Sequence, residues 1–485
     1  MMITGQQLIN GQWVQGEAGQ YQAVNPAVAA FIEPVMSYAS KAQVHQAVAA
    51  AAEAASVFAA TSLKQRAEFL ELCADEIMAL GDVLPERVAL ETGYPKARGE
   101  GERARTVNQL RLFASSIRSG EYLNIRIDTA LPDRQPLPRP DIRYTNQPIG
   151  PVVVFGASNF PLAFSVAGGD TISALAAGCP VIFKAHPAHP KTGDLVGSAI
   201  SKAVASCGLP AGVFALIHGS SHEVGSHLVQ HPAITAVGFT GSFRGGKALY
   251  DLAVRRPHPI PVYAEMGSVN PVILLSNKIA EDPAALAAGL AGSVCMGVGQ
   301  FCTNPGLLIL QKKDAGLLDL LAAELDKLPL GTFLTNGIAS AYTEGVSNLA
   351  KHSKKLTSHE LPAPALFVAD AASANREVLE EVFGPCTVAI LVENEAEMLT
   401  FIESLDGQLT GTIQGTKAEI SEELVDTLLQ KVGRLLFNGF PTGVEVSGAM
   451  VHGGPFPATT DSRSTSVGTQ AIYRFVRVVC LQNKI

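Results

Sequence analysis

The sequence predicts an α/β protein with two parallel-sheet domains. At 485 residues the chain exceeds the size of one ordinary hydrophobic core, so two or three domains are expected. Short apolar runs alternate with helical stretches in two successive series, a pattern typical of doubly wound parallel sheets. The first series comprises residues 151–155, 181–184, 213–217 and 236–239, and the second, beyond Glu265, comprises 271–275, 307–310, 387–392 and 434–437.

The region before the first series is predicted to be helical after a short strand-like start. Each of two helices opens with a capping box, formed by Ser40 with Gln43 and by Ser62 with Gln65. A proline-rich passage at 131–148 then leads to the first apolar run, and we expect it to form an extended arm. Arms of this kind often pair across a subunit interface.

The composition excludes several classes of function. The chain is 47% hydrophobic and 16% charged, which excludes disorder, and its net charge of −8 is spread without long runs that would bind nucleic acid or a membrane surface. Neither a signal peptide nor a run of about 20 apolar residues is found. The seven scattered cysteines include no Cys-x-x-Cys pair. We therefore expect a cytoplasmic protein that acts on small molecules.

Two residues have the chemistry of a nucleophile and a base. Cys302 follows a glycine-rich stretch at 297–299 and precedes a predicted strand, so its sulfur and its backbone N–H could face one bound carbonyl. Glu265 ends a predicted strand, where the active sites of doubly wound sheets lie. Singly, a packed cysteine and a solvated glutamate are the commoner alternatives.

Two loops complete the set of candidates. Asn159, in the loop after the first strand of the series, could direct its amide N–H to a developing oxyanion, although turn-forming asparagines are commoner. A turn containing Gly241, Ser242 and Gly246 follows a strand and opens a helix, as a phosphate-binding turn does.

Taken together and in this order, these segments resemble the aldehyde dehydrogenase superfamily along essentially the whole chain. The matching elements are Asn-Gly-Gln-Trp at 10–13, Glu-Thr-Gly at 91–93, Asn-Phe-Pro at 159–161, Phe-Thr-Gly-Ser at 239–242, Gly-Gln-Phe-Cys at 299–302 and Glu-Val-Phe-Gly-Pro at 381–385. Within the superfamily, residues 156–161, 184–187, 265–271 and 452–459 resemble the branch that oxidises 2,5-dioxovalerate (α-ketoglutaric semialdehyde) to 2-oxoglutarate. A related branch oxidises fatty and other aliphatic aldehydes, and this is the alternative.

The resemblance implies three structural parts. A Rossmann-like, dinucleotide-binding domain would comprise residues 1–127 and 148–258, and an α/β catalytic domain carrying the cysteine would comprise 259–455. A small β oligomerisation arm would comprise 128–147 and 466–485, in a homodimer or homotetramer.

The resemblance also implies a role for each candidate. The Cys302 thiolate would attack the aldehyde, Asn159 would stabilise the oxyanion, and Glu265 would activate the water that hydrolyses the thioester. The cofactor would be bound by Lys184, Glu381 and Phe383 together with the turn at Gly241, Ser242 and Gly246. Nothing in the sequence calls for a metal.

The residues after Lys184 point to NADP, with NAD as the other possible cofactor. NAD-preferring relatives commonly carry a glutamate three residues after this lysine, where its charge repels a 2′-phosphate. Here that position is Pro187, and His186, His189 and Lys191 lie nearby in sequence. Without the carboxylate, a 2′-phosphate would meet less repulsion and some attraction.

A carboxylate-bearing substrate needs a cationic partner, and two arginines are candidates: Arg111, on the helical segment after 91–93, and Arg463, in a C-terminal loop. Alternatively, each of them is an arginine that faces solvent or lies in an interface and binds no substrate.

Two other classes of protein are possible alternatives to this enzyme. A catalytically silent member of the family would lack Cys302, Glu265 or Asn159, and all three are present. A cysteine hydrolase without a cofactor would need a histidine base, and none of the eleven histidines stands in a recognisable partner motif.

Overall fold

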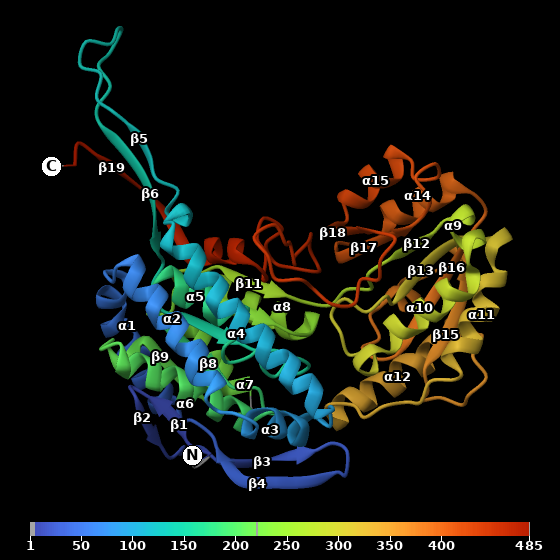
Figure 1. The fold of residues 1–485 in the computed structure, drawn as a ribbon, viewed down its shortest axis with the longest axis horizontal. Coiled ribbons are helices and arrows are strands. Elements are labelled where there is room, and N and C mark those ends of the chain that lie inside the picture. The colour runs from blue at the N-terminus through green and yellow to red at the C-terminus, as the bar shows by residue number, and fades with distance from the viewer. Residues whose placement is uncertain (1–4, 220–221, 485) are drawn as a thin grey trace.

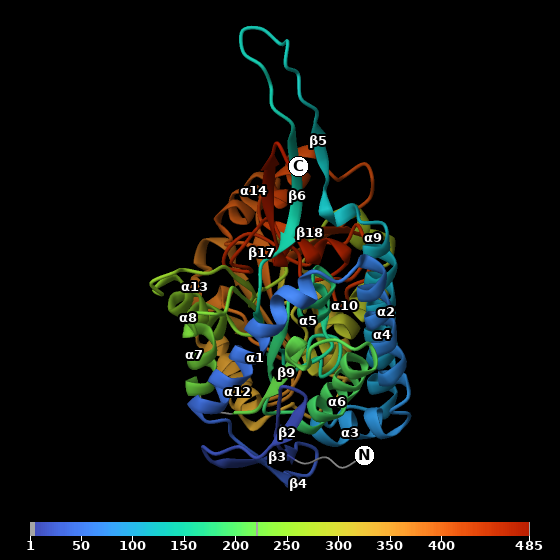
Figure 2. The ribbon, with the colours of Figure 1, turned by 90° about the vertical axis from the view of Figure 1, so that its left-hand side faces the viewer.

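The computed structural model describes residues 5–219 and 222–484. Two α/β lobes lie side by side, and a long arm projects from the first (Figures 1 and 2). Residues 1–4, which form part of the stretch read for a signal peptide, lie outside the described residues. Among the described residues no helix is long and apolar enough to cross a membrane.

The first sheet has the order β11-β10-β7-β8-β9-β1-β2, and its first five strands are parallel. From β7 the chain moves in one direction to β8 and β9, and then places β10 and β11 on the opposite side. The chain therefore changes direction between the neighbouring strands β7 and β10. Sheets of this kind bind ligands at such a topological switch point. The strands are β1 (Gln7–Ile9), β2 (Gln12–Val14), β7 (Val152–Phe155), β8 (Val181–Lys184), β9 (Phe214–Ile217), β10 (Ala236–Thr240) and β11 (Val262–Glu265).

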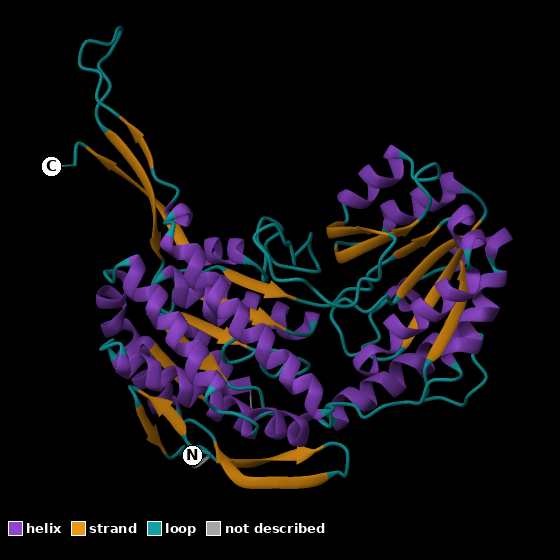
Figure 3. Cartoon of the chain, in the orientation of Figure 1, coloured by secondary structure: helices purple, strands orange, loops and turns teal. Residues whose placement is uncertain are grey.

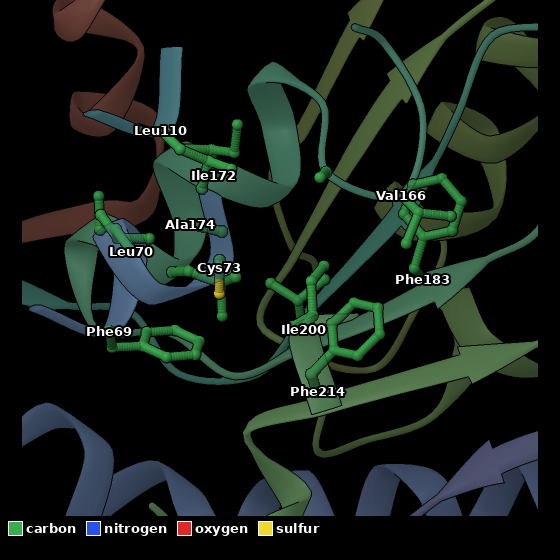
Figure 4. Close-up of a cluster of buried hydrophobic side chains, with 14 of the residues drawn as sticks. Phe69, Leu70, Cys73, Leu110, Val166, Ile172, Ala174, Phe183, Ile200 and Phe214 are labelled. Carbon is green, nitrogen blue, oxygen red and sulfur yellow. The ribbon is translucent and has the colours of Figure 1, made fainter. Parts of the chain in front are cut away.

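Helices cover both faces of this sheet (Figure 3). They are α1 (Lys41–Ala59), α2 (Leu63–Met78), α3 (Val83–Thr92), α4 (Lys96–Arg118), α5 (Gly169–Ala177), α6 (Pro190–Ser206), α7 (His222–Gln230) and α8 (Phe243–Val254). The structure confirms both capping boxes, with Ser40 and Ser62 accepting from the backbone N–H groups of Gln43 and Gln65. On one face α2, α4, α5 and α6 enclose a core that includes Phe69, Leu110, Ile172, Phe183 and Ile200 (Figure 4).

The second sheet has the order β14-β15-β16-β13-β12-β17-β18 and is parallel except for the short strand β14. Its strands are β12 (Val272–Leu274), β13 (Leu307–Gln311), β14 (Lys354–Lys355), β15 (Ala365–Asp370), β16 (Cys386–Val392), β17 (Gln408–Gln414) and β18 (Val432–Phe437). Its helices are α9 (Ser276–Glu281), α10 (Pro283–Cys295), α11 (Gly316–Leu325), α12 (Asn336–His352), α13 (Arg376–Leu379), α14 (Glu395–Ser404) and α15 (Glu422–Leu429).

The proline-rich passage lies in the projecting arm. The arm is a three-stranded antiparallel sheet of β5 (Arg126–Asp128), β6 (Ile142–Pro148) and β19 (Val476–Gln482), with β6 in the middle. Between Ser466 and β19 the chain forms the 3₁₀ helix η6 (Thr469–Phe475). A separate hairpin, β3 (Gln20–Asn25) with β4 (Ala30–Ser37), lies at the opposite end of the molecule (Figure 1).

Sheet membership changes after Glu265. Strand β11 follows residue 258 in the chain, yet it pairs in parallel with β10 of the first sheet. The boundary expected at 258/259 therefore places the last strand of the first sheet in the other domain. Apolar runs alone could not reveal this, because both sheets have the same pattern.

The structure gives a role to the Glu-Thr-Gly element at 91–93. The buried carboxylate of Glu91 accepts from the backbone N–H groups of Lys191 and Thr192 (3.1 and 2.9 Å) and from the Thr192 hydroxyl (2.8 Å). It thus satisfies the free donors at the start of α6, a hundred residues away in sequence.

Glu91→Ala should leave these buried donors without a partner. We expect a loss of about 3 kcal/mol of stability, measured as a melting temperature lowered by about 5 °C or more. The control is Glu86→Ala on the same helix, which removes only a surface contact with Lys96. Equal melting temperatures for Glu91→Ala and Glu86→Ala would contradict this role.

Candidate active site

Three segments far apart in sequence meet beyond the carboxyl end of β11. Glu265 is the last residue of that strand, Cys302 follows α10 and a short 3₁₀ turn, and His452 belongs to the long loop between β18 and η6. The Cys302 Sγ lies 3.4 Å from His452 Nε2, and that nitrogen lies 2.7 Å from Glu265 Oε1. The other Glu265 oxygen accepts from the Ser466 hydroxyl at 2.6 Å. These contacts form a cluster of a thiol, an imidazole and a carboxylate.

The electrostatics of the cluster hold the carboxylate charged and the thiol neutral. Burial by itself would raise the pKa of Glu265, but His452, Ser466 and Cys302 outweigh it and lower that pKa below its usual value. Burial raises the pKa of the Cys302 thiol well above its usual value, and the charge of Glu265 raises it further. The thiol therefore needs a neighbouring base before it becomes a nucleophile.

The backbone before Cys302 is held in an unusual path. Gly297, Val298 and Gly299 have φ values of 56°, 61° and 65°, in the left-handed region that favours glycine. A side chain at Gly299 would also meet the backbone of Gly384 at 2.2 Å. The Asn270 amide then donates to the carbonyls of Cys302 (2.9 Å) and Asn304 (2.8 Å), which fixes the turn that carries the thiol.

Asn159 lies against the same turn. Its side-chain amide donates to the Gln300 carbonyl at 2.8 Å, and the residue is buried. A primary amide has two N–H groups, so one remains for a ligand oxygen. Among the described residues the Cys302 backbone N–H has no acceptor. The two donors have the chemistry of an oxyanion hole.

The expected cofactor residues lie at the carboxyl edge of the first sheet. Lys184 ends β8, and Gly241 and Ser242 begin the turn into α8, where the Ser242 hydroxyl caps the helix by accepting from Gly245. Gly246 packs so closely on Met266 that a side chain there would meet it at 2.7 Å. Burial lowers the pKa of Lys184 to about 8.

Glu381 and Phe383 line a small open pocket, together with Ser268, Gly299 and Phe301. The Glu381 carboxylate lies so close to Gly267 that a side chain there would meet it at 2.3 Å. The pocket adjoins the turn of Cys302 through Gly299 and Phe301, and the free N–H groups at the N-terminus of α8 suit a phosphate. These residues fit a dinucleotide.

The histidines after Lys184 differ in their surroundings. His186 is half-buried and stacks on His189. Its pKa lies well below the usual value, mainly because of burial and also because of the charges of His189 and Lys184. His189 is buried, with its Nε2 3.0 Å from the Ala157 carbonyl. The Lys191 amine does not join this group, because it donates to the Ile32 carbonyl of β4. Of the three neighbours in sequence, only His186 remains half-exposed beside Lys184 and Pro187.

The structure does not bring Arg111 and Arg463 to the cluster. Arg111 is exposed and pairs with Asp75 of α2 at 3.0 Å. Arg463 has a 90% exposed side chain beside Asp461. On α4 a position six residues beyond Arg105 is rotated by about 240° from it, so Arg111 faces solvent while Arg105 faces inward.

His452 is a residue of the candidate site that the sequence analysis missed. No histidine stands in a recognisable partner motif, yet His452 contacts Cys302 from 150 residues away. Its only signal was a histidine followed by two glycines at 453–454, in a segment read for resemblance alone. Gly453 permits a close approach, because a side chain there would meet the Ser464 carbonyl at 2.5 Å.

The same three side chains are a possible metal site. The ligand atoms of Glu265, Cys302 and His452 all lie within 4.8 Å of one another. The Glu265 and His452 atoms already contact each other at 2.7 Å, so both would have to separate to bind an ion. The cluster is therefore better suited to proton transfer than to ligation.

Fold and site together define a class, a two-lobed α/β protein with a buried thiol, an imidazole and a carboxylate at the carboxyl edge of a doubly wound sheet. The family model described as "Aldehyde dehydrogenase family" matches residues 13–455. The chain belongs to the aldehyde dehydrogenase family.

Its relatives include two of similar length. The alpha-ketoglutaric semialdehyde dehydrogenase 2 of Azospirillum brasilense is 50% identical, covering 100% of this chain and 95% of its own. The alpha-ketoglutaric semialdehyde dehydrogenase of Acinetobacter baylyi is 47% identical, covering 99% and 94%.

Solved structures show the same fold at lower identity. The betaine aldehyde dehydrogenase of Staphylococcus aureus in complex with NAD+ has a TM-score of 0.85 at 20% identity, covering 99% of this chain and 95% of its own. The 1-pyrroline-5-carboxylate dehydrogenase of Thermus with bound NAD has a TM-score of 0.83 at 23% identity, covering 98% and 92%.

His452→Gln should slow alkylation of Cys302 by iodoacetamide. Without the imidazole, the thiol faces a Glu265 charge that has lost its His452 partner, so the pKa of the thiol rises further and less thiolate is present at pH 7.5. We expect at least a tenfold slower reaction, about one pKa unit, with the rate rising only at higher pH. The modified Cys302 peptide is quantified by mass spectrometry.

Two controls accompany this measurement. The exposed Cys480 reports general thiol reactivity in the same sample, and His258→Gln changes an exposed histidine. Unchanged alkylation of Cys302 in His452→Gln would show that the imidazole does not serve the thiol.

Proposed function

We propose that this enzyme oxidises 2,5-dioxovalerate to 2-oxoglutarate with a nicotinamide dinucleotide. The observation that carries the reaction class is the contact series from Cys302 through His452 to Glu265. The substrate is supported by the two relatives at 50% and 47% identity, both described as alpha-ketoglutaric semialdehyde dehydrogenases.

A specific observation favours the second candidate, oxidation of fatty or other aliphatic aldehydes. An apolar cluster lies beside Asn159 and Cys302, formed by Ala157, Phe160, Ala163, Phe164, Phe301 and Val467. Val444, Val446 and Met450 of the long loop pack against it. Such a wall would accept an alkyl chain.

The proposed chemistry begins with the thiol. The pair of Glu265 and His452 takes the proton from Cys302, and the thiolate attacks the aldehyde carbon to give a tetrahedral thiohemiacetal. Asn159 Nδ2 and the Cys302 backbone N–H donate to its oxyanion. The bound dinucleotide supplies the hydride acceptor. Glu265 then takes a proton from the water that hydrolyses the thioester, and this frees the thiol and the acid.

Lys184, Glu381, Phe383 and the turn at Gly241, Ser242 and Gly246 would hold the cofactor, and we infer a preference for NADP. Lys184 is the one charged group of the 184–189 segment near pH 7, since the lowered pKa values leave His186 and His189 neutral there. Pro187 stands where a carboxylate would repel a 2′-phosphate, and neutral His186 can still donate a hydrogen bond.

We also propose that the arm joins copies of this chain in a homodimer or homotetramer. The arm carries exposed apolar residues, among them Ile127 (55% exposed), Leu137 (69%) and Val478 (58%). Exposed strands with apolar side chains are suited to pairing with another chain.

Steady-state rates decide between the two substrate classes. We expect kcat/KM for 2,5-dioxovalerate to exceed that for pentanal, an uncharged aldehyde of equal carbon number, by at least about tenfold. Cys302→Ala should be inactive on both while still binding cofactor. A higher kcat/KM for pentanal or longer alkyl aldehydes would support the second candidate and reject the first.

NADP should be used at least as efficiently as NAD, and Pro187→Glu should shift the ratio of the two specificity constants toward NAD by about tenfold or more. Affinity for NADP should fall as pH rises through about 8, where Lys184 loses its proton. The control is the KM for aldehyde, which Pro187→Glu should not change. A more than tenfold preference of the unmodified enzyme for NAD would refute the inference.

A further inference from the structure

Arg105 of α4 is a cation without a partner. Its Nε and Nη2 atoms are buried and make no hydrogen bond, and it forms no ion pair with any carboxylate of the described residues. Burial lowers its pKa, and the charges of Glu102, Cys302, Glu445 and Glu265 act in the opposite direction. An unpaired buried guanidinium is costly, so its retention indicates an anionic group that the protein itself does not supply.

The neighbouring arginines are satisfied, which sets Arg105 apart. Arg98, two turns earlier on α4, donates to the Asn159 carbonyl, pairs with Glu102 at 3.3 Å and lies over the rings of Tyr94, Phe160 and Phe301. Arg434, whose charge also acts near Cys302, donates to the carbonyls of Pro441 and Gly443 and so fixes that loop. Arg434 keeps one buried nitrogen, Nε, without a hydrogen bond, whereas Arg105 has two such nitrogens and makes no hydrogen bond or ion pair within the described residues.

The position of Arg105 relates it to the catalytic cluster. Its guanidinium carbon lies 5.4 Å from the centre of the Phe164 ring, and the His452 ring centre lies 6.0 Å from the same ring. Phe164 belongs to the apolar cluster beside Cys302. Arg105 and His452, the side chain that contacts the thiol, therefore both lie against the Phe164 ring.

We propose that Arg105 binds the carboxylate at the far end of the substrate and selects for aldehydes that carry one. The inference rests on the proposed function, and Arg105 is the residue that would select its class of substrate. The fork of the guanidinium can bind both carboxylate oxygens. The aldehyde carbon of a five-carbon semialdehyde lies about 5 Å from its carboxylate carbon, since each bond advances the chain by a little over 1 Å.

The surroundings of Arg105 fit the rest of such a molecule. The methylene carbons would lie along the apolar cluster that contains Phe160 and Phe164. Two further buried donors without a partner are close to Arg105 and Phe164 in sequence, Gln109 Nε2 one turn later on α4 and Ser165 Oγ next to Phe164. An alkyl aldehyde would leave all of these donors unsatisfied, whereas a ligand with carboxylate and keto oxygens would not.

The test compares one pair of aldehydes in four proteins. Arg105→Gln removes the charge at similar length, Arg105→Lys keeps the charge without the fork, and Arg118→Gln is the control on the same helix, where Arg118 pairs with Glu71 at the surface. KM and kcat are measured for 2,5-dioxovalerate and for pentanal, and glutarate is titrated as a competitive inhibitor.

We expect Arg105→Gln to raise KM for 2,5-dioxovalerate and Ki for glutarate by about 10- to 100-fold. KM for pentanal should change less than threefold, Arg105→Lys should lie between, and Arg118→Gln should match the unmodified enzyme. Suppose that the unmodified enzyme prefers 2,5-dioxovalerate but that Arg105→Gln and Arg105→Lys reduce kcat/KM equally for both aldehydes. This result would overturn the role of Arg105 and leave the proposed function standing. Preference of the unmodified enzyme for pentanal would instead overturn the proposed function.

Discussion

Glu265 holds a negative charge at the carboxyl end of a buried strand, and the active site is organised around the need to stabilise that charge. Ser466 donates to one oxygen and His452 lies against the other. These two contacts hold the long C-terminal loop against the edge of the first sheet. Backbone bonds reinforce this contact, since Met266 and Thr460 donate to the carbonyls of Ala458 and Ala264. The imidazole then lies beside Cys302, which belongs to the second lobe.

This arrangement joins two lobes through a few polar contacts. Asn270, in the link between the lobes, holds the Cys302 turn by donating to its carbonyl, and the Gln408 side chain accepts from the backbone N–H groups of Val269 and Asn270. These bonds set the distance between a thiol from one lobe and a base from the other. Catalysis by proton transfer needs that distance to be held within a few tenths of an ångström.

The sequence predicted the parts that follow from local pattern. Apolar runs marked the central strands of both sheets and capping boxes marked the starts of α1 and α2, because both depend on neighbouring residues. Cys302, Glu265 and Asn159 were found through motifs, and the structure brings them together. The assignment of β11 to the first sheet was missed, since sheet membership depends on distant pairing.

The residues missed in the site have a common physical reason. His452 lies in a loop without periodicity, and nothing local indicates that it reaches a cysteine 150 positions away. Arg111 was a candidate and Arg105 was not, because the sequence identifies an arginine but not its partner. Asp75 on α2 satisfies Arg111, while nothing satisfies Arg105, and only tertiary structure distinguishes the two.

The arm and the catalytic loop are one continuous piece of chain, and this governs where the protein tolerates changes in length. Only η6 separates Ser466, the partner of Glu265, from strand β19, and β19 is fixed in register along all of β6. A residue inserted between them would either shift the register of β19 on β6 or move Ser466 away from the Glu265 carboxylate. The segment between Ser466 and β19 is therefore where the chain tolerates a change in length least.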